Sequence, residues 1–237
     1  MPDQQRKLYL IPSTLGNPDI TRVIPPFNAG IIFSLQHFVV EDERSARRFL
    51  IHCGYKGDIQ SIHFHLLNEH TARQDVPAIF RNSGTADLGM ISEAGLPAVA
   101  DPGALLVEEA YRLHIKVIPL SGPSSLMLAL MASGLNGQHF AFNGYLPVKG
   151  PERAAKIRVL ERRSEIEKQT QLFIETPYRN NQLAEAFLNT CKPSTKLCIA
   201  VNLTLGDEWV QTRTIQEWRK NPLPDLKKKP AVFLLQA

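Results

Sequence analysis

Short apolar runs alternate along the first half of the chain with segments in which apolar residues recur every three or four positions. The runs predict strands at 7–12, 37–41, 59–66, 87–92 and 115–120. The periodic segments predict helices over 43–54, where Gly54 ends the helix, and over 105–114. Alternation of strand and helix is typical of an α/β domain with a mostly parallel sheet.

The pattern changes after residue 120. Residues 121–134 predict a buried helix, because its body is apolar all round, Ser121 can cap it and Pro123 suits its first turn. A basic amphipathic segment, 145–163, and a helix near 179–190 follow. Further strands are predicted at 170–176, 196–201, 208–215 and 230–237. We therefore predict two α/β domains, 1–119 and 120–237.

One loop has an unusual composition. Residues 89–103 read GMISEAGLPAVADPG, an apolar strand end followed by glycines, prolines and acids. In open α/β folds, ligands bind outside the carboxyl ends of strands, and Gly95 permits a close backbone approach there. The alternative is a tight turn without a ligand. The chain has neither a G-x-G-x-x-G motif nor a P-loop motif, which argues against a common dinucleotide enzyme and against a P-loop NTPase.

Composition narrows the class of protein only a little. The chain has 237 residues, a formal net charge of +4 and a pI near 9.0. This mild excess of base is compatible with nucleic acid or an anionic ligand, and equally with a solvated basic surface. Cys53, Cys191 and Cys198 form no C-x-x-C pair and suit a reducing compartment. The N-terminus lacks an apolar stretch long enough for a signal peptide, and the most apolar segment, 124–135, is too short to span a bilayer, so we expect a cytoplasmic protein with no membrane contact.

Six ordered motifs carry a resemblance to a known family. They are LYLIPSTLGNPDI (8–20), VVEDERSARRFL (39–50), MISEAGLPAVADPG (90–103), VIPLSGPSS (117–125), FNGYLPVKGPER (142–153) and FIETPYR (173–179). Together the segments resemble the tetrapyrrole methylase superfamily of S-adenosylmethionine-dependent methyltransferases. Within it they are most similar to the branch that methylates ribose 2′-oxygens of small-subunit ribosomal RNA.

The resemblance implies two α/β domains with a cofactor cleft between them, and S-adenosylmethionine as the methyl donor. It implies no metal, a homodimer, and ribosomal RNA or the small ribosomal subunit as partner. Residues carried over by motif as neighbours of the donor are Pro12, Gly16, Asn17, Ser92, Glu93, Ala94, Gly95, Pro97, Ser124, Ser125, Ile174, Glu175, Leu203, Pro230 and Ala231.

The candidate catalytic residues are acids. A ribose hydroxyl is a weak acid, so a nearby base assists its methylation, and Glu41, Asp42 and Glu93 are the candidates. Glu41 and Asp42 also suit an N-terminal helix cap, a role that one residue can combine with catalysis.

Basic residues and histidines are the remaining candidates. Arg44, Arg47, Lys149 and Arg153 are predicted to contact substrate phosphates, and Arg48, Lys156 and Arg158 extend the same basic track. A solvated helix face is the alternative for all of them. His63, His65 and His70 lack a fitting acid or cysteine, so no metal site is expected.

The predicted function is therefore a methyltransferase acting on a ribose 2′-oxygen of small-subunit ribosomal RNA. A methylase of a tetrapyrrole precursor or another small molecule is the first alternative; those relatives open with a G-P-G-D loop, whereas this chain has PSTLGNPD. A non-catalytic homologue that binds the donor or RNA is the second. It rests on departures from the family pattern at Glu93, Leu96, Ser121 and Asn202, and at the KKPAVFLLQA segment.

Overall fold

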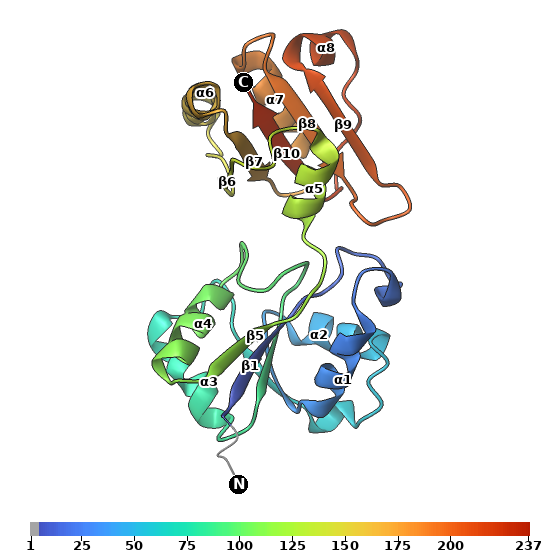
Figure 1. The fold of residues 1–237 in the computed structure, drawn as a ribbon, viewed down its shortest axis with the longest axis vertical. Helices are drawn as coiled ribbons and strands as arrows, with labels where there is room; N and C mark the ends of the chain where they lie inside the picture. Colours follow the sequence, from blue (N-terminus) through green and yellow to red (C-terminus); the bar gives the residue numbers. More distant parts are fainter. Residues whose placement is uncertain (1–4) are drawn as a thin grey trace. The chain divides into compact units, whose positions relative to one another are not determined.

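The computed structural model describes residues 5–237, which form two compact units (Figure 1). The first unit ends at Ser124 and the second begins at Ser125, whereas the sequence prediction placed the boundary after residue 119. Each unit holds one five-stranded sheet. In the part of the chain that is described, no helix combines the length and the apolar character needed to cross a bilayer.

The sheet of the first unit is wholly parallel and has the order β3-β2-β4-β1-β5. Its strands are β1 (Lys7–Ile11), β2 (His37–Val40), β3 (His63–Leu66), β4 (Leu88–Ile91) and β5 (Lys116–Pro119). The helices between them are α1 (Pro26–Ser34), α2 (Glu43–His52), α3 (Val76–Asn82) and α4 (Gly103–Arg112). Three 3₁₀ turns, η1 (Ile20–Arg22), η2 (Ile59–Ser61) and η3 (Arg73–Asp75), lie in the connections.

Two apolar clusters cover the two faces of this sheet. Phe80 of α3 and Leu106 of α4 belong to one cluster, and Ile32 of α1 and Leu50 of α2 belong to the other. The helix pairs therefore lie on opposite faces, as the ribbon shows (Figure 1). The chain from β1 to β3 proceeds through α1 and α2, and the chain from β3 to β5 returns through α3 and α4. Connections leaving the carboxyl ends of β1 and β4 thus run to opposite faces, which opens a crevice there.

Sequence reasoning misplaced part of this unit. The strand predicted at 59–66 begins only at His63, because Asp58 accepts a hydrogen bond from the Gln60 N–H (2.9 Å) and forms the 3₁₀ turn η2. Helices α1 and α3 were not predicted. In α1 apolar residues are spread around the helix, and α3 has only seven residues, so neither leaves a clear helical period.

The sheet of the second unit is mixed, with the order β6-β7-β10-β8-β9. Only β6 and β7 are parallel, so the mostly parallel sheet predicted from the first half of the chain is found in the first unit alone. The strands are β6 (Phe140–Phe142), β7 (Thr170–Ile174), β8 (Lys196–Val201), β9 (Trp209–Thr214) and β10 (Ala231–Gln236). The helices are α5 (Ser125–Ser133), α6 (Gly150–Glu167), α7 (Asn180–Thr190) and α8 (Ile215–Lys220).

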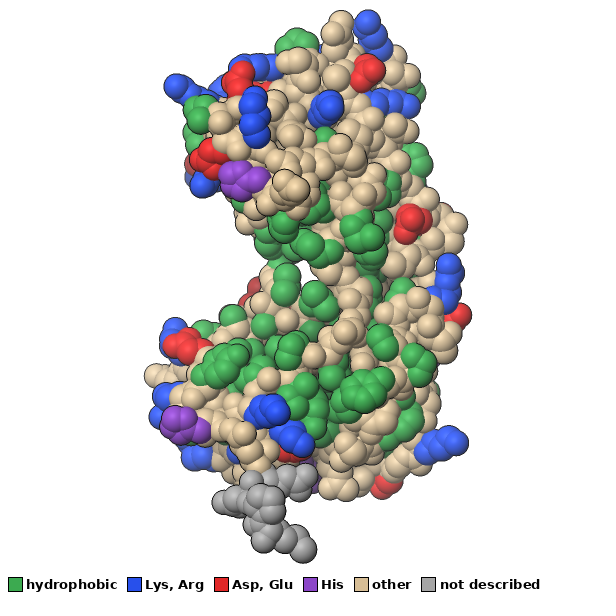
Figure 2. Space-filling view, viewed as in Figure 1, with side chains coloured by type: hydrophobic (Ala, Val, Ile, Leu, Met, Phe, Trp, Pro, Cys, Tyr) green, Lys and Arg blue, Asp and Glu red, His purple; other side chains and the backbone are tan. Residues whose placement is uncertain are grey.

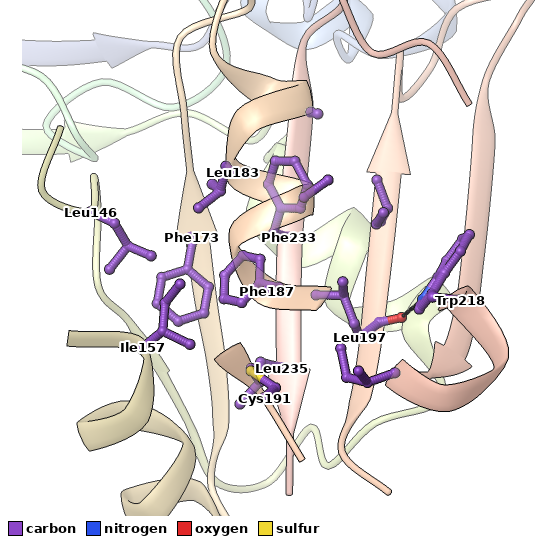
Figure 3. Packing of buried hydrophobic residues seen from close by; sticks show 14 of the residues in the cluster. Leu146, Ile157, Phe173, Leu183, Phe187, Cys191, Leu197, Trp218, Phe233 and Leu235 are labelled. Carbon is purple, nitrogen blue, oxygen red and sulfur yellow. Dashed lines mark hydrogen bonds between the residues drawn. The ribbon is translucent and has the colours of Figure 1, made fainter. Parts of the chain in front are cut away.

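Aromatic side chains fill the core between this sheet and helices α6, α7 and α8 (Figure 3). Phe187 of α7 is fully buried, with its ring centroid 5.3 Å from that of Phe173 and 6.1 Å from that of Phe233. Trp218 of α8 closes the same cluster and donates its indole N–H to the Leu197 carbonyl (2.8 Å).

Helix α5 lies against β8, β9 and β10. It begins at Ser125, so Ser121 and Pro123 precede the helix and do not cap it as predicted. The prediction of burial on all sides is also wrong, since Leu130 is buried but Met131 is 80% exposed. One face of α5 packs on the sheet. The opposite, exposed face is also apolar, so the sequence pattern did not distinguish the two faces.

We expect Phe187→Ala to lower the free energy of unfolding of the second unit by about 3–5 kcal/mol, the range for truncating a buried phenylalanine. Urea unfolding followed by tryptophan fluorescence reports this directly, because Trp209 and Trp218 both lie in this unit. Val159→Ala, which truncates a 62% exposed side chain of α6, is the control and is expected to change stability by less than about 0.5 kcal/mol. Equal effects of the two variants would contradict the packing described.

Candidate active site

A pocket of about 440 Å³ lies in the first unit, at the carboxyl ends of β1, β2 and β4. Its position matches the crevice that the topology opens, and its volume falls in the range of ligand sites. One wall comes from the loops after β1 and β4, and the other from α2. The lining residues are Ser13, Thr14, Gly16, Asn17, Pro18, Val40, Ser45, Ala46, Arg48, Phe49, His52, Ile91, Ser92 and Glu93.

The carbonyl of Gly95 joins the two loops of the first wall. It accepts the Ser13 backbone N–H (3.0 Å) and the Ser92 hydroxyl (2.7 Å). Gly95 itself has φ +75°, and a Cβ there would lie 3.3 Å from Leu15 Cδ2 and 3.4 Å from the Pro123 carbonyl oxygen. The glycine is therefore required by the turn and by packing of neighbouring loops.

Ser13 brings an unused polar group to this wall. The residue is only 5% exposed, and among the described residues its hydroxyl has no hydrogen-bond partner. A buried hydroxyl without a partner costs free energy, and a bound polar ligand can supply the missing partner.

Glu93 lines the pocket, and the carboxyl groups of Glu41 and Asp101, which do not line it, interact electrostatically with each other. The Glu93 backbone N–H donates to the Glu41 carboxylate, and burial followed by the charges of Asp101 and Glu93 raises the pKa of Glu41. Burial also raises the pKa of Asp101, although its Oδ1 accepts the N–H groups of Ala98 and Gly103 (both 2.8 Å). An acid with a raised pKa near a pocket is suited to proton transfer, so Glu41 fits the predicted role of base.

Asp42 has a structural role. It is the N-cap of α2, and its carboxylate accepts the Ser45 backbone N–H at 2.8 Å. The N–H and the hydroxyl of Ser45 lower the pKa of Asp42. Glu93 lines the pocket, whereas Asp42 does not.

The predicted donor-binding residues of the first unit lie at the same end of the sheet. Pro12, Gly16 and Asn17 follow β1, and the segment Ser92 to Pro97 follows β4. Of these, Gly16, Asn17, Ser92 and Glu93 line the pocket; Pro12, Ala94, Gly95, Pro97 and Ser124 do not.

The predicted donor-binding residues of the second unit lie together at one end of the strands of its sheet. Because β10 runs antiparallel to β7 and β8, its first residues pair with their last ones, Val232 with Ile174 and Ala231 with Val201. The Asn202 N–H donates to the Pro230 carbonyl (3.0 Å). Leu203, the next residue, therefore lies at the same end of the strands. Ser125 is the first residue of α5.

Glu175 follows β7 at this end of the strands, and its contacts stabilise the fold. Its side chain is fully buried, and its Oε1 accepts the Thr176 N–H (2.7 Å) and two guanidinium N–H groups of Arg179 (2.6 and 3.0 Å). Its second oxygen, Oε2, is buried and has no hydrogen-bond partner among the described residues.

The predicted substrate-binding residues fall into different environments. Arg44 is exposed on α2. Arg47 donates to the Ile59 carbonyl (3.0 Å), lies 3.7 Å from Glu43 and covers the Phe64 ring, so it stabilises the fold. Lys149 pairs with Glu152 at 3.6 Å. Arg153 of α6 buries its Nε and one terminal nitrogen with no partner among the described residues, which leaves donors for an anion.

Sequence reasoning left Ser13, Ser45, Phe49 and His52 out of the site. The last three share one face of α2 with Arg48, at spacings of three and four residues, and only the position of the pocket identifies that face.

Three histidines of the first sheet, His37, His63 and His65, form a cluster. His37 of β2 stacks on His63 (centroids 4.6 Å apart) and on His65 (5.5 Å), and its Nδ1 lies 3.2 Å from His65 Nε2. His70 lies apart from them beside Glu69. Burial, then His63 and Arg6 lower the pKa of His37. Residues 5–237 contain no group of three or more histidines, cysteines and acids able to hold a metal ion.

Comparison with solved structures defines the class of the fold. The methyltransferase CobJ superposes with a TM-score of 0.62 at 14% identity, over 98% of this chain and 93% of the other. Cobalt precorrin-4 methyltransferase CbiF superposes with a TM-score of 0.59 at 14% identity, over 97% and 94%. The chain thus shares the α/β fold of these two methyltransferases, as predicted.

Comparison with curated sequences gives the family. No protein-family model matches the chain. Proteins named ribosomal RNA small subunit methyltransferase I match it in Vibrio cholerae (29% identity, 89% of this chain, 69% of the relative) and in Pseudomonas aeruginosa (32%, 73% and 57%). The protein of that name in Mesorhizobium japonicum is 33% identical over 88% of this chain and 67% of the relative. The chain belongs to the ribosomal RNA small subunit methyltransferase I family.

This membership confirms the predicted family, the enzyme class and S-adenosylmethionine as the cofactor of that class. The chain spans 57% to 69% of the length of these three relatives.

Two substitutions at Asp42 separate its cap role from a catalytic one. We expect Asp42→Asn to keep the cap and normal methyl transfer, and Asp42→Ala to lower the thermal midpoint. Because the pKa of Asp42 is lowered in the fold, its stabilisation is present above the ordinary aspartate pKa and is lost as pH falls through the lowered value. Thermal melts from pH 7 to pH 2 test this. A folded Asp42→Asn variant without methyl transfer would show that the carboxylate takes part in catalysis.

Proposed function

We propose that this protein transfers the methyl group of S-adenosylmethionine to a ribose 2′-oxygen of small-subunit ribosomal RNA. The observation that carries the proposal is the family membership, with relatives of that name matching 73% to 89% of the chain. The methylation of ribose oxygen, as opposed to a base, rests on the motif resemblance.

The residues of the first unit suit the donor. S-adenosylmethionine supplies, when bound, an electrophilic methyl group on a positively charged sulfur. Carboxylates of Glu41 and Glu93 beside the pocket favour such a cation. The free Ser13 hydroxyl offers a hydrogen bond to a polar group of the ligand. That the residues at the edge of the second sheet contact the same donor remains a prediction from the family.

Glu41 is the proposed base. Its raised pKa places the carboxylate closer to neutral pH, where a base is most effective, and the Glu93 N–H orients it. The remainder of the rate enhancement comes from holding the acceptor oxygen in line with the methyl group.

The surface charge is compatible with a nucleic-acid partner but does not by itself require one. Lysine and arginine side chains are spread over the visible faces of both units and form no single dense patch (Figure 2). With a net charge of +4, this favours contacts with separated phosphates of a folded RNA. A homodimer and a cytoplasmic location remain predictions.

The test of function is mass spectrometry of small-subunit RNA fragments from cells with and without this gene. We expect one nucleotide to lose a mass of one methyl group on its ribose when the gene is absent, and purified protein with donor to restore it. Transfer to a porphyrinogen and not to RNA would instead establish the tetrapyrrole alternative. Donor binding without any transfer would establish the non-catalytic one.

For Glu41→Gln we expect methyl transfer to slow by about 10²–10⁴-fold while donor binding persists. In the unmodified protein the rate should fall as pH falls through the raised pKa of Glu41, and the variant should lack this step. A raised carboxyl pKa means stability is lost as pH rises through it, so the neutral glutamine should leave the thermal midpoint at pH 7 unchanged or higher. Single-turnover rates from pH 4.5 to 8 and thermal melts measure both effects.

The control for this prediction is Glu185→Gln, an exposed carboxylate of α7 in the second unit. It should leave both the rate and its pH dependence unchanged. Normal single-turnover rates for Glu41→Gln would remove Glu41 from the catalytic step.

A further inference from the structure

One face of α2 forms the second wall of the 440 Å³ pocket. Ser45, Arg48, Phe49 and His52 all line it, and their spacing of three, one and three residues places them on one side of the helix. The face thus combines a hydroxyl, a guanidinium, an aromatic ring and an imidazole. None of these side chains belongs to the acidic wall on which the proposed transfer depends.

The two neighbouring arginines of α2 have different environments. Arg47 is held by the Ile59 carbonyl and Glu43 on the side away from the pocket. Arg48 donates to the Ser45 hydroxyl at 3.3 Å and its charge helps to lower the pKa of Asp42, but within residues 5–237 it forms no salt bridge. Its charge is therefore available to a ligand in the pocket.

His52 lies four residues beyond Arg48, at the last position of α2, and is exposed. Residues four apart on a helix lie next to each other, so the imidazole and the guanidinium flank the same part of the pocket. Both side chains carry N–H donors that an anion lying between them can accept.

The opposite wall offers groups of another kind. Ser13, Ser92 and Glu93 lie there, on the wall proposed above to bind the donor, which leaves the α2 wall for the RNA. An unstacked nucleotide has a sugar, a phosphate on each side and a flat base. Proteins that read single-stranded RNA bind such nucleotides with aromatic rings and cations.

We propose that Arg48 and His52 of α2 bind the backbone phosphates of a single-stranded RNA segment, with Phe49 as the apolar surface beneath one of its bases. This inference rests on the proposed function, because it assigns the substrate-recognition wall of the same pocket. It also replaces Arg44 and Arg47 by Arg48 and His52 as the RNA contacts of this helix.

The experiment measures binding of small ribosomal subunits, prepared from cells lacking the gene, to unmodified protein and to Arg48→Gln and His52→Gln. Arg48→Gln removes one charged phosphate contact, so we expect the slope of log affinity against log salt concentration to fall by about 0.7. His52→Gln removes a hydrogen-bond donor to phosphate, so we expect it to lower the affinity for the subunit. Donor affinity, measured by calorimetry, should remain unchanged. Arg48→Lys keeps the charge and should restore most of the slope.

Lys56→Gln and His70→Gln are the matched controls, since they remove the same kinds of group from exposed positions that do not line the pocket. They should leave the slope and the affinity at those of the unmodified protein. The inference is overturned if Arg48→Gln and His52→Gln behave like these controls, or if they abolish donor binding. Failure of the proposed function is seen separately, as absence of methyl transfer to the subunits by unmodified protein.

Discussion

The carbonyl oxygen of Gly95 is the point on which the geometry of the site depends. Two loops leave the sheet at neighbouring strands and turn to opposite faces, and nothing in the sheet ladder itself holds them together beyond β1 and β4. Hydrogen bonds from the Ser13 N–H and the Ser92 hydroxyl to this one oxygen close the gap. Because Gly95 adopts φ +75°, its carbonyl can point at both donors. The acidic wall of the pocket thereby keeps its shape before any ligand arrives.

The second unit reaches a similar result with another topology. There β10 lies between β7 and β8 and is antiparallel to both. The first residues of β10 therefore lie beside the last residues of β7 and β8. Backbone groups from three separate parts of the sequence become neighbours without any side chain dedicated to the purpose. This suits recognition of a ligand by main-chain atoms, which tolerates variation of the side chains.

Local pattern predicted most strands and the longer helices, because strong apolar periodicity and short connections agree with the final packing. It did not predict α1, whose apolar residues surround the helix, nor the antiparallel pairing of β10, since strand direction leaves no trace in a short apolar run. For the site, motif resemblance identified the loops after β1 and β4. It named both Arg47 and Arg48 on α2, and only the three-dimensional position of the helix shows that Arg48 lines the pocket whereas Arg47 contacts Ile59.

The place of β10 in its sheet has a consequence for biosynthesis. The first unit's sheet uses residues 7–119, so its hydrogen-bonding partners are all present once that stretch has emerged from the ribosome. The second sheet has no centre until residues 231–236 are made, and until then β7 and β8 expose unpaired edges and the apolar surface around Phe173. During synthesis there is therefore a stage at which the first unit can fold while the second unit is incomplete and prone to aggregate. We expect that stage to be the one at which cellular chaperones engage this protein.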